Sequence, residues 1–228
     1  MKTLSTPGML AFVVLAAVAL PTGERVWAAD KDKPARPAVG DEAVDFELKT
    51  LGAESVKLSK LVADGPVVLI VLRGYPGYQC PVCTAQVGQF LSNAKKFDAA
   101  KARVVMVYPG SADGLKKQAE DFVRGKTLPD NFYLVLDPDY AFTKAYHLRW
   151  EAKSETAYPA TFVIDRKRKS QFAKISMTHG GRASADEVLK ALSASVSTLP
   201  NDPSSATAAT RRANCNRDAM PPFAAAHG

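Results

Sequence analysis

Residues 67–83 read VVLIVLRGYPGYQCPVC, and this stretch decides how the chain folds. It opens with an unbroken apolar run over 67–72, rich in β-branched residues, as is typical of a strand buried on both faces of a sheet. It closes on Cys80 and Cys83, and the intervening Pro81 suits the first turn of a helix, where its missing N–H leaves no hydrogen bond unmade. The stretch therefore predicts a buried strand, a turn that carries two cysteines, and a helix that begins near Pro81.

The segments downstream of this stretch continue the alternation of strands and helices. Apolar runs predict strands over residues 103–108, 132–136 and 161–165, with a hairpin partner for the last one over 171–176. Helical spacing of apolar residues predicts helices over 87–97 and 115–123, a short helix over 139–147, and a last helix that opens at the capping box 184–187. Such alternation predicts an α/β fold of three layers, in which helices cover both faces of a mostly parallel sheet and the hairpin adds an antiparallel edge.

The two ends of the chain differ from its middle. Residues 9–20 form an apolar run of 12 residues after Lys2, which is shorter than the ~20 residues needed to span a bilayer. Small residues at Val26 and Ala28 suit a cleavage site. We therefore expect a signal peptide over 1–28, cleaved after Ala28, and a periplasmic or secreted protein that meets a membrane only through an uncleaved signal. A flexible leader over 29–38, a folded domain over 39–197 and a disordered tail over 198–228 would follow.

Composition narrows the class of protein further. The chain has 228 residues, of which 46% are hydrophobic and 23% charged, so one globular domain of ordinary size fits with residues left at both ends. The formal net charge of +7 is scattered along the chain. Its densest basic run, residues 166–169, directly follows an apolar segment and contains no aromatic residues. We therefore expect no nucleic-acid partner.

The placement of Cys80 and Cys83 favours redox chemistry. The free amides and the positive dipole end of a helix favour a thiolate, and a two-residue gap on the first turn brings the two sulfurs within bonding distance. Reversible dithiol–disulfide exchange requires both features. Two other interpretations remain open, namely an inert short-loop disulfide and a structural zinc site completed by His147, His179 or a carboxylate. The third cysteine, Cys215, lies in the expected tail, as a bystander or a crosslinker between molecules.

The chain resembles thioredoxin-fold redoxins of the alkyl hydroperoxide reductase and thiol-specific antioxidant family, over roughly residues 39–197. The resemblance lies in the order and spacing of several short segments, at 39–48, 58–61, 67–83, 136–139 and 159–165. The first of these is similar to the strand that opens the fold in this family. The resemblance implies a thioredoxin-like α/β fold of three layers, with a mixed central sheet and helices on both faces.

One branch of this family, the peroxiredoxins, carries a P-x-x-x-T-x-x-C motif whose cysteine attacks peroxide. Pro76 and Cys83 have this spacing, while Cys80 stands at the threonine position. Peroxiredoxins also carry an arginine at the position that Pro159 occupies here. This resemblance implies a thiol peroxidase in which Cys83 attacks, forms a sulfenic acid, and is resolved by Cys80 or Cys215.

Thioredoxin-like disulfide reductases instead use a C-x-x-C pair and a cis-proline that lies opposite it, just before a strand. The dipeptide Tyr158-Pro159 stands at that position, directly before the strand expected over 161–165. We therefore expect a cis peptide bond before Pro159, which would leave backbone open for an extended substrate. In this mechanism Cys80 would attack and Cys83 would resolve. A plain proline at the start of a strand is the alternative interpretation.

A few further side chains are candidates for the site. Arg73 follows the strand expected over 67–72 and either assists the thiolate or is a charge at a strand end. Arg149 is a second candidate for the arginine that peroxiredoxins use. Tyr75 and Tyr78 flank the cysteine turn, and Tyr158 precedes the candidate cis-proline. We expect Tyr78 and Tyr158 to contact substrate, with simple packing as the alternative.

We predict an exported thiol–disulfide oxidoreductase, an antioxidant redoxin, that works through a Cys80–Cys83 dithiol–disulfide couple without a cofactor or metal. Its catalytic residues would be the two cysteines, Pro159 and Arg73. Its partners would be protein dithiols and disulfides, or hydroperoxides, together with a thiol electron donor. A thiol peroxidase with Cys83 as the attacking sulfur is the second candidate. A copper carrier that adds His147 or His179 to the cysteines is the third, although copper carriers of this fold resemble C-x-x-x-C, one residue longer.

Overall fold

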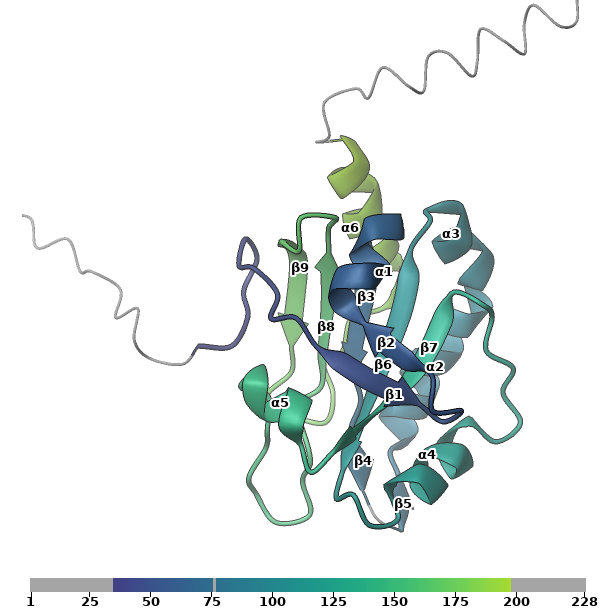
Figure 1. Cartoon of the computed structure of the whole chain (residues 1–228), viewed down its shortest axis with the longest axis vertical. Coiled ribbons are helices and arrows are strands. Elements are labelled where there is room, and N and C mark those ends of the chain that lie inside the picture. Colours follow the sequence, from purple (N-terminus) through teal and green to yellow (C-terminus); the bar gives the residue numbers. More distant parts are fainter. Residues whose placement is uncertain (1–34, 76, 198–228) are drawn as a thin grey trace, which may run out of the picture. The chain divides into compact units, whose positions relative to one another are not determined.

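The computed structural model of this protein describes residues 35–75 and 77–197 (Figure 1). The expected signal peptide over 1–28, most of the leader, the tail over 198–228 with Cys215, and Pro76 lie outside these residues. Within them, no helix is both long and apolar enough to cross a membrane.

A mixed sheet of seven strands forms the middle layer of the fold (Figure 1). Its strands lie in the spatial order β2 (Ser55–Lys57), β1 (Glu47–Thr50), β7 (Phe132–Pro138), β6 (Arg103–Gly110), β3 (Val67–Val71), β8 (Ala160–Ile164) and β9 (Ser170–Ile175). Only β3–β6 and β6–β7 pair in parallel, and the other four neighbouring pairs are antiparallel. The expectation of a mostly parallel sheet is therefore wrong, because β8 returns antiparallel beside β3. The expected hairpin edge of β8 and β9 is confirmed.

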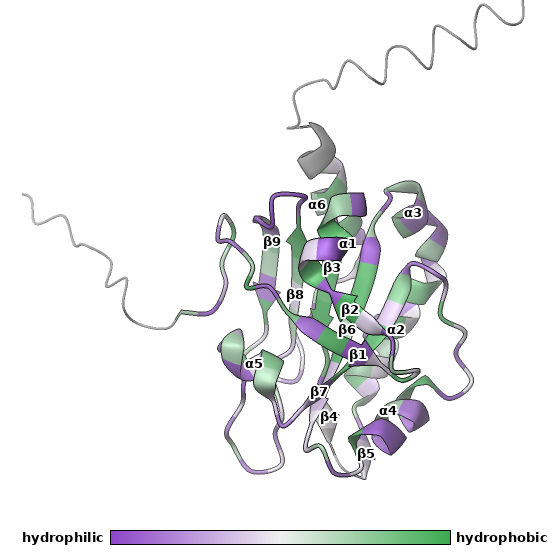
Figure 2. Cartoon of the chain, in the orientation of Figure 1, coloured by the Kyte–Doolittle hydropathy of each residue, from purple (hydrophilic) through white to green (hydrophobic). Residues whose placement is uncertain are grey.

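Helices cover both faces of this sheet, as the sequence predicts. The side chains of β3 alternate between the two faces of the sheet. Val68 and Ile70 belong to one core cluster, and Val67, Leu69 and Val71 belong to the other. The first cluster includes buried residues from α2 (Pro81–Ser92), α3 (Ala94–Ala99), α4 (Leu115–Val123) and α6 (Ala185–Ser197). The second includes buried residues from α1 (Leu58–Asp64) and α5 (Ala141–Ala145). All five residues of β3 are buried, and the apolar colour of the central strands is plain in Figure 2.

Two boundaries differ from the sequence-based expectations. The helix expected over 87–97 is two helices, because the chain bends at Asn93 (φ −104°, ψ 13°) between α2 and α3. The opening strand begins only at Glu47, whereas the residues before it run past the end of the β8–β9 hairpin. There the Gly40 and Ala43 amides donate to the carbonyls of Ser170 and Arg168. Apolar periodicity predicts a helix but not a bend within it, so the break at Asn93 could not be predicted from the sequence pattern.

The last helix begins as its capping box predicts. The amide of Ser184 donates to Glu187 Oε2 at 2.8 Å, and the amide of Glu187 donates to Ser184 Oγ at 3.2 Å. These two bonds satisfy amides that a helix start leaves free. They also fix the loop that connects β9 to α6, which reaches the cysteines.

Candidate active site

The cysteine turn forms where the chain leaves the central strand β3. After Arg73 the chain makes a small hairpin of β4 (Gly74–Tyr75) and β5 (Tyr78–Gln79), whose turn contains Gly77 at φ +74°. Helix α2 then begins at Pro81, with Cys80 as its N-cap residue and Cys83 within its first turn. The predicted order of buried strand, cysteine turn and helix start is therefore confirmed.

Both cysteines are free thiols that face the protein interior. The exposed fraction is 3% for Cys80 and 1% for Cys83. The amide of Arg73 donates a hydrogen bond to Cys83 Sγ at 3.3 Å, and Cys83 Sγ lies 3.9 Å from the Arg73 carbonyl oxygen. The end of β3 therefore encloses Cys83 with backbone groups, while Cys80 lies at the start of the helix.

Arg73 is held by an ion pair beside the cysteines. Its Nε lies 2.5 Å from Glu155 Oε2, and His179 Nε2 lies 2.9 Å from the other oxygen of the same carboxylate. Burial raises the pKa of Glu155, but the hydrogen bonds from Arg73 and His179 outweigh burial and leave that pKa below its ordinary value. The Arg73 guanidinium also lies 5.9 Å from the centre of the Trp150 ring. Arg73 thus brings both its backbone and its charge to the site.

A second arginine, Arg182, completes the surroundings of the cysteine pair. It lies in the loop between β9 and α6, and its Nη2 is 3.6 Å from Cys80 Sγ. The sequence-based reasoning missed this residue, because nothing in the local pattern around position 182 indicates that its loop returns to the cysteine turn. Gln86 on α2 links that loop to the helix and to β8, because its Nε2 donates to the Ala183 carbonyl at 3.0 Å and to Thr161 Oγ1 at 3.3 Å.

The environment moves the pKa values of the two thiols in opposite directions. The hydrogen bond with the Cys83 thiol is the largest cause that lowers the pKa of Cys80 to about 5; the amides of Cys83 and Val82 and the charge of Arg182 act in the same direction, against burial. The same hydrogen bond, together with burial, raises the pKa of Cys83 well above its ordinary value. At neutral pH the pair therefore holds one thiolate, on Cys80, and one thiol, on Cys83.

The structure corrects the expectation for Pro159. The peptide bond before this residue is trans, since no described residue follows a cis bond. Pro159 is buried directly before β8, and its carbonyl accepts a hydrogen bond from the Ser176 amide at 2.8 Å. That bond extends the pairing of β8 with β9, so Pro159 is a proline at the start of a strand and not an open cis turn.

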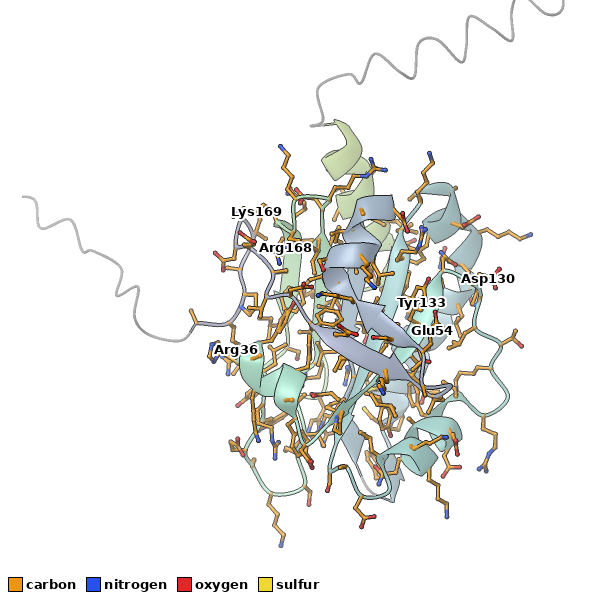
Figure 3. All side chains as sticks on the ribbon, in the orientation of Figure 1. Arg36, Glu54, Asp130, Tyr133, Arg168 and Lys169 are labelled. Carbon is orange, nitrogen blue, oxygen red and sulfur yellow. The ribbon has the colours of Figure 1, made fainter. Side chains whose placement is uncertain are left out.

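The two tyrosines expected to contact substrate lie in different settings. Tyr78 is 47% exposed on β5, two residues before Cys80. Tyr158 stacks on Trp150, with ring centres 4.8 Å apart and planes 9° apart, and the Arg36 guanidinium, labelled in Figure 3, lies 4.5 Å from the centre of its ring. Tyr158 therefore belongs to an aromatic stack beside Arg73. Substrate contact by either tyrosine stays a prediction.

The other candidate residues are not assembled around the sulfurs. Arg149 uses its Nη1 on the backbone carbonyls of Glu155 and Thr156, at 2.9 and 2.7 Å, so it shapes the loop before β8. His147 is exposed after α5, whereas His179 is the partner of Glu155. Among residues 35–75 and 77–197, no group of three or more His, Cys, Asp and Glu side chains could hold a metal ion. Neither the zinc nor the copper interpretation therefore gains a ligand set from this part of the chain.

We expect Gly74→Ala to destabilise the fold by about 1–3 kcal/mol and to disturb the cysteine turn. A Cβ at this position would lie 2.6 Å from the Pro109 carbonyl oxygen and 2.6 Å from Cε1 of Tyr108. Tyr108 in turn donates a hydrogen bond to Gln79 in the β4–β5 hairpin, at 3.1 Å. Urea unfolding of the purified variant measures the loss.

Gly88→Ala is the matched control for that substitution. Gly88 lies within α2, and a Cβ there would meet nothing within 4 Å. We expect this change to raise the free energy of unfolding by about 0.5–1 kcal/mol, because alanine favours a helix over glycine. Equal stabilities of the two variants would contradict the close packing inferred for Gly74.

Comparison with known proteins identifies the family. Residues 39–172 match the AhpC/TSA family. A Mycobacterium tuberculosis protein assigned to the peroxiredoxins is 32% identical over 157 residues, which cover 68% of this chain and 96% of the relative. Peroxiredoxin Bcp of Bacillus subtilis is 30% identical over 135 residues, which cover 57% of this chain and 79% of that protein.

A solved structure supports the same assignment. The crystal structure of peroxidoxin BcpB from Mycobacterium tuberculosis has a TM-score of 0.56 and 29% sequence identity, and the match covers 69% of this chain and 97% of that chain. The family match spans more than half of the sequence and includes β3, the cysteine turn and α2. The chain therefore belongs to the AhpC/TSA family, as a peroxiredoxin-like oxidoreductase with a thioredoxin-like fold.

Proposed function

We propose that this protein is a thiol peroxidase that reduces hydroperoxides at the Cys80–Cys83 pair and is restored by a thiol donor. The observation that carries the proposal is the placement of both sulfurs at the start of α2, inside the segment that matches the AhpC/TSA family. Peroxiredoxins take hydroperoxides as substrates and thiols as reductants, which supports the same two partners here. Family membership thus favours peroxidase activity over the disulfide exchange that the sequence pattern puts first.

The reaction needs one sulfur to attack and a second sulfur to resolve. A thiolate attacks one oxygen of the peroxide, the O–O bond breaks, and the other oxygen leaves with a proton as an alcohol or water. The resulting sulfenic acid is attacked by the second cysteine, which forms the disulfide and releases water. The pair thereby loses two electrons and the peroxide gains two. Two equivalents of an external thiol then return the disulfide to the dithiol.

Peroxide consumption by the full-length chain tests this function. With dithiothreitol as donor, we expect the wild type to reduce hydrogen peroxide and cumene hydroperoxide catalytically, and the Cys80→Ser/Cys83→Ser double variant to be inactive. Without donor, one equivalent of peroxide should remove two free thiols and lower the mass by two hydrogens. A wild type no faster than the double variant would overturn the proposal.

Thiol–disulfide exchange is the second candidate function. The lowered pKa of Cys80, about 5, favours it, because a stable thiolate beside a second thiol also suits attack on a disulfide. Reduction of insulin disulfides, with a mixed disulfide trapped on Cys80 in Cys83→Ser, would support exchange. If that activity is present while peroxide turnover is absent, exchange becomes the leading function.

The proposed location is outside the cytoplasm. The apolar run over residues 9–20 and the small residues before Ala29 support export. Sequencing of the mature N-terminus in the native host tests this, and we expect it to begin at Ala29. A mature chain that still begins at Met1 would contradict cleavage.

A further inference from the structure

An arginine reaches the cysteine pair from a part of the chain that the family match does not include. The match ends at residue 172, whereas Arg182 follows β9 and places Nη2 3.6 Å from Cys80 Sγ. Position 159, where the resemblance to peroxiredoxins implies an arginine, holds a buried proline. A cation beside Cys80 therefore comes from a loop other than the segment that holds position 159.

The guanidinium of Arg182 has N–H donors beside Cys80 that form no hydrogen bond within the described residues. Its Nε and Nη1 are both buried and have no hydrogen-bond partner within the described residues. A buried donor left without an acceptor destabilises a protein, and the effect is larger when the group is charged. Such donors are suited to an oxygen atom that arrives next to the sulfur, as a peroxide or a sulfenic acid would supply.

The surroundings of the two sulfurs also assign them different roles. Cys83 is enclosed by the backbone of Arg73, whose amide donates to its sulfur at 3.3 Å. Cys80 instead is the N-cap residue of α2, where the positive end of the helix dipole lies. The pKa values agree with this division, since that of Cys80 is lowered to about 5 and that of Cys83 is raised.

We propose that Cys80 is the sulfur that attacks the hydroperoxide, that Arg182 binds the peroxide oxygens beside it, and that Cys83 resolves the sulfenic acid. This order is the reverse of the one that the peroxiredoxin motif implies, in which the cysteine at position 83 attacks. The inference rests on the proposed peroxidase function and specifies its first step. The Cys80 thiolate takes one peroxide oxygen, the leaving alkoxide or hydroxide takes a proton from solvent, and Cys83 then displaces water to form the disulfide.

Trapping of the sulfenic acid decides the order of attack. Cys80→Ser and Cys83→Ser are each treated with one equivalent of hydrogen peroxide and dimedone at pH 7, and the labelled peptide is followed by mass spectrometry. We expect rapid labelling of Cys80 in Cys83→Ser, where the serine hydroxyl still offers a hydrogen bond. Labelling of Cys83 in Cys80→Ser should be slower by about 100-fold, because a thiol with an ordinary or raised pKa is at most about 1% ionised at pH 7. Labelling of Cys83 at an equal or greater rate would overturn the proposed order.

The role of Arg182 is tested by Arg182→Gln and Arg182→Lys, with Arg124→Gln as the matched control. The side chain of Arg124 is 78% exposed at the end of α4, where it forms an ion pair with Asp121. We expect Arg182→Gln to slow the labelling of Cys80 by about tenfold or more and to move its alkylation to higher pH, and Arg182→Lys to restore part of both, because the charge returns. Arg124→Gln should match the wild type.

Each outcome separates this inference from the function on which it rests. If Arg182→Gln has the rate and pH profile of Arg124→Gln, the role of Arg182 is overturned while peroxidase function stands. If the wild type consumes peroxide, but dimedone labels Cys83 in Cys80→Ser and does not label Cys80 in Cys83→Ser, the proposed order of attack is wrong while the peroxidase function stands. If the wild type consumes no peroxide, the proposed function fails and this inference fails with it.

Discussion

Iodoacetamide is expected to alkylate Cys80 of the reduced protein along a pH curve whose midpoint lies near 5. The environment lowers the pKa of this thiol to about 5, against an ordinary value of 9.0, and the hydrogen bond with the Cys83 thiol is the largest cause. At pH 7 a thiol with the ordinary pKa would be about 1% thiolate, whereas nearly all of the Cys80 population is thiolate. The reactive form of Cys80 is therefore roughly 100-fold more abundant than that of an ordinary cysteine. Quantification of the Cys80 peptide by mass spectrometry, after timed alkylation between pH 4 and pH 9, gives the curve.

Alkylation of Cys80 increases with pH because the thiolate is the form that reacts. A thiolate is favoured when its neighbours donate hydrogen bonds or carry positive charge, so alkylation should rise through pH 5 and level off before pH 7. Cys83→Ala removes the largest favourable interaction and should move the midpoint upward. Cys83 in the wild type should react only at high pH, since its pKa is raised. A Cys80 curve that still climbs at pH 8 would contradict the assignment of the thiolate.

Phe90→Ala is expected to lower the free energy of unfolding by about 3–5 kcal/mol. Phe90 lies on α2 with 0% exposure, and its ring stacks on Phe97 with centres 5.2 Å apart and planes 5° apart. Truncation leaves a cavity where the cysteine-bearing helix packs on the first core cluster, which lines one face of the sheet. Urea unfolding followed by far-UV circular dichroism measures the loss.

Val39→Ala provides the control for that substitution. Val39 is 62% exposed, so its truncation should change the free energy of unfolding by no more than about 0.5 kcal/mol. We also expect Phe90→Ala to reduce the reactivity of Cys80, because a loosened α2 no longer holds its first amides beside the sulfur. A loss below 1 kcal/mol for Phe90→Ala would mean that the helix does not depend on this contact.

Local sequence patterns were sufficient for most of the fold. Short segments predicted three elements correctly, namely the strand β3 from its apolar run, the start of α2 from its proline, and the start of α6 from its capping box. Their order along the chain then implies a layered α/β domain. The direction of β8 was not predictable in this way, because a strand pattern carries no information on which way the neighbouring strand runs.

The chain's sequence by itself determined that two cysteines stand at the start of a helix behind a buried strand. Only the tertiary structure decided what surrounds them, since Arg182 lies 102 residues beyond Cys80 and the Arg73–Glu155 pair spans 82 residues. It also decided that Pro159 is trans, because the pairing of β8 with β9 fixes the backbone there. Periodicity and capping act over one or two turns of chain, whereas the charged side chains beside the two thiols come from distant loops that are brought together when the sheet and its helices pack.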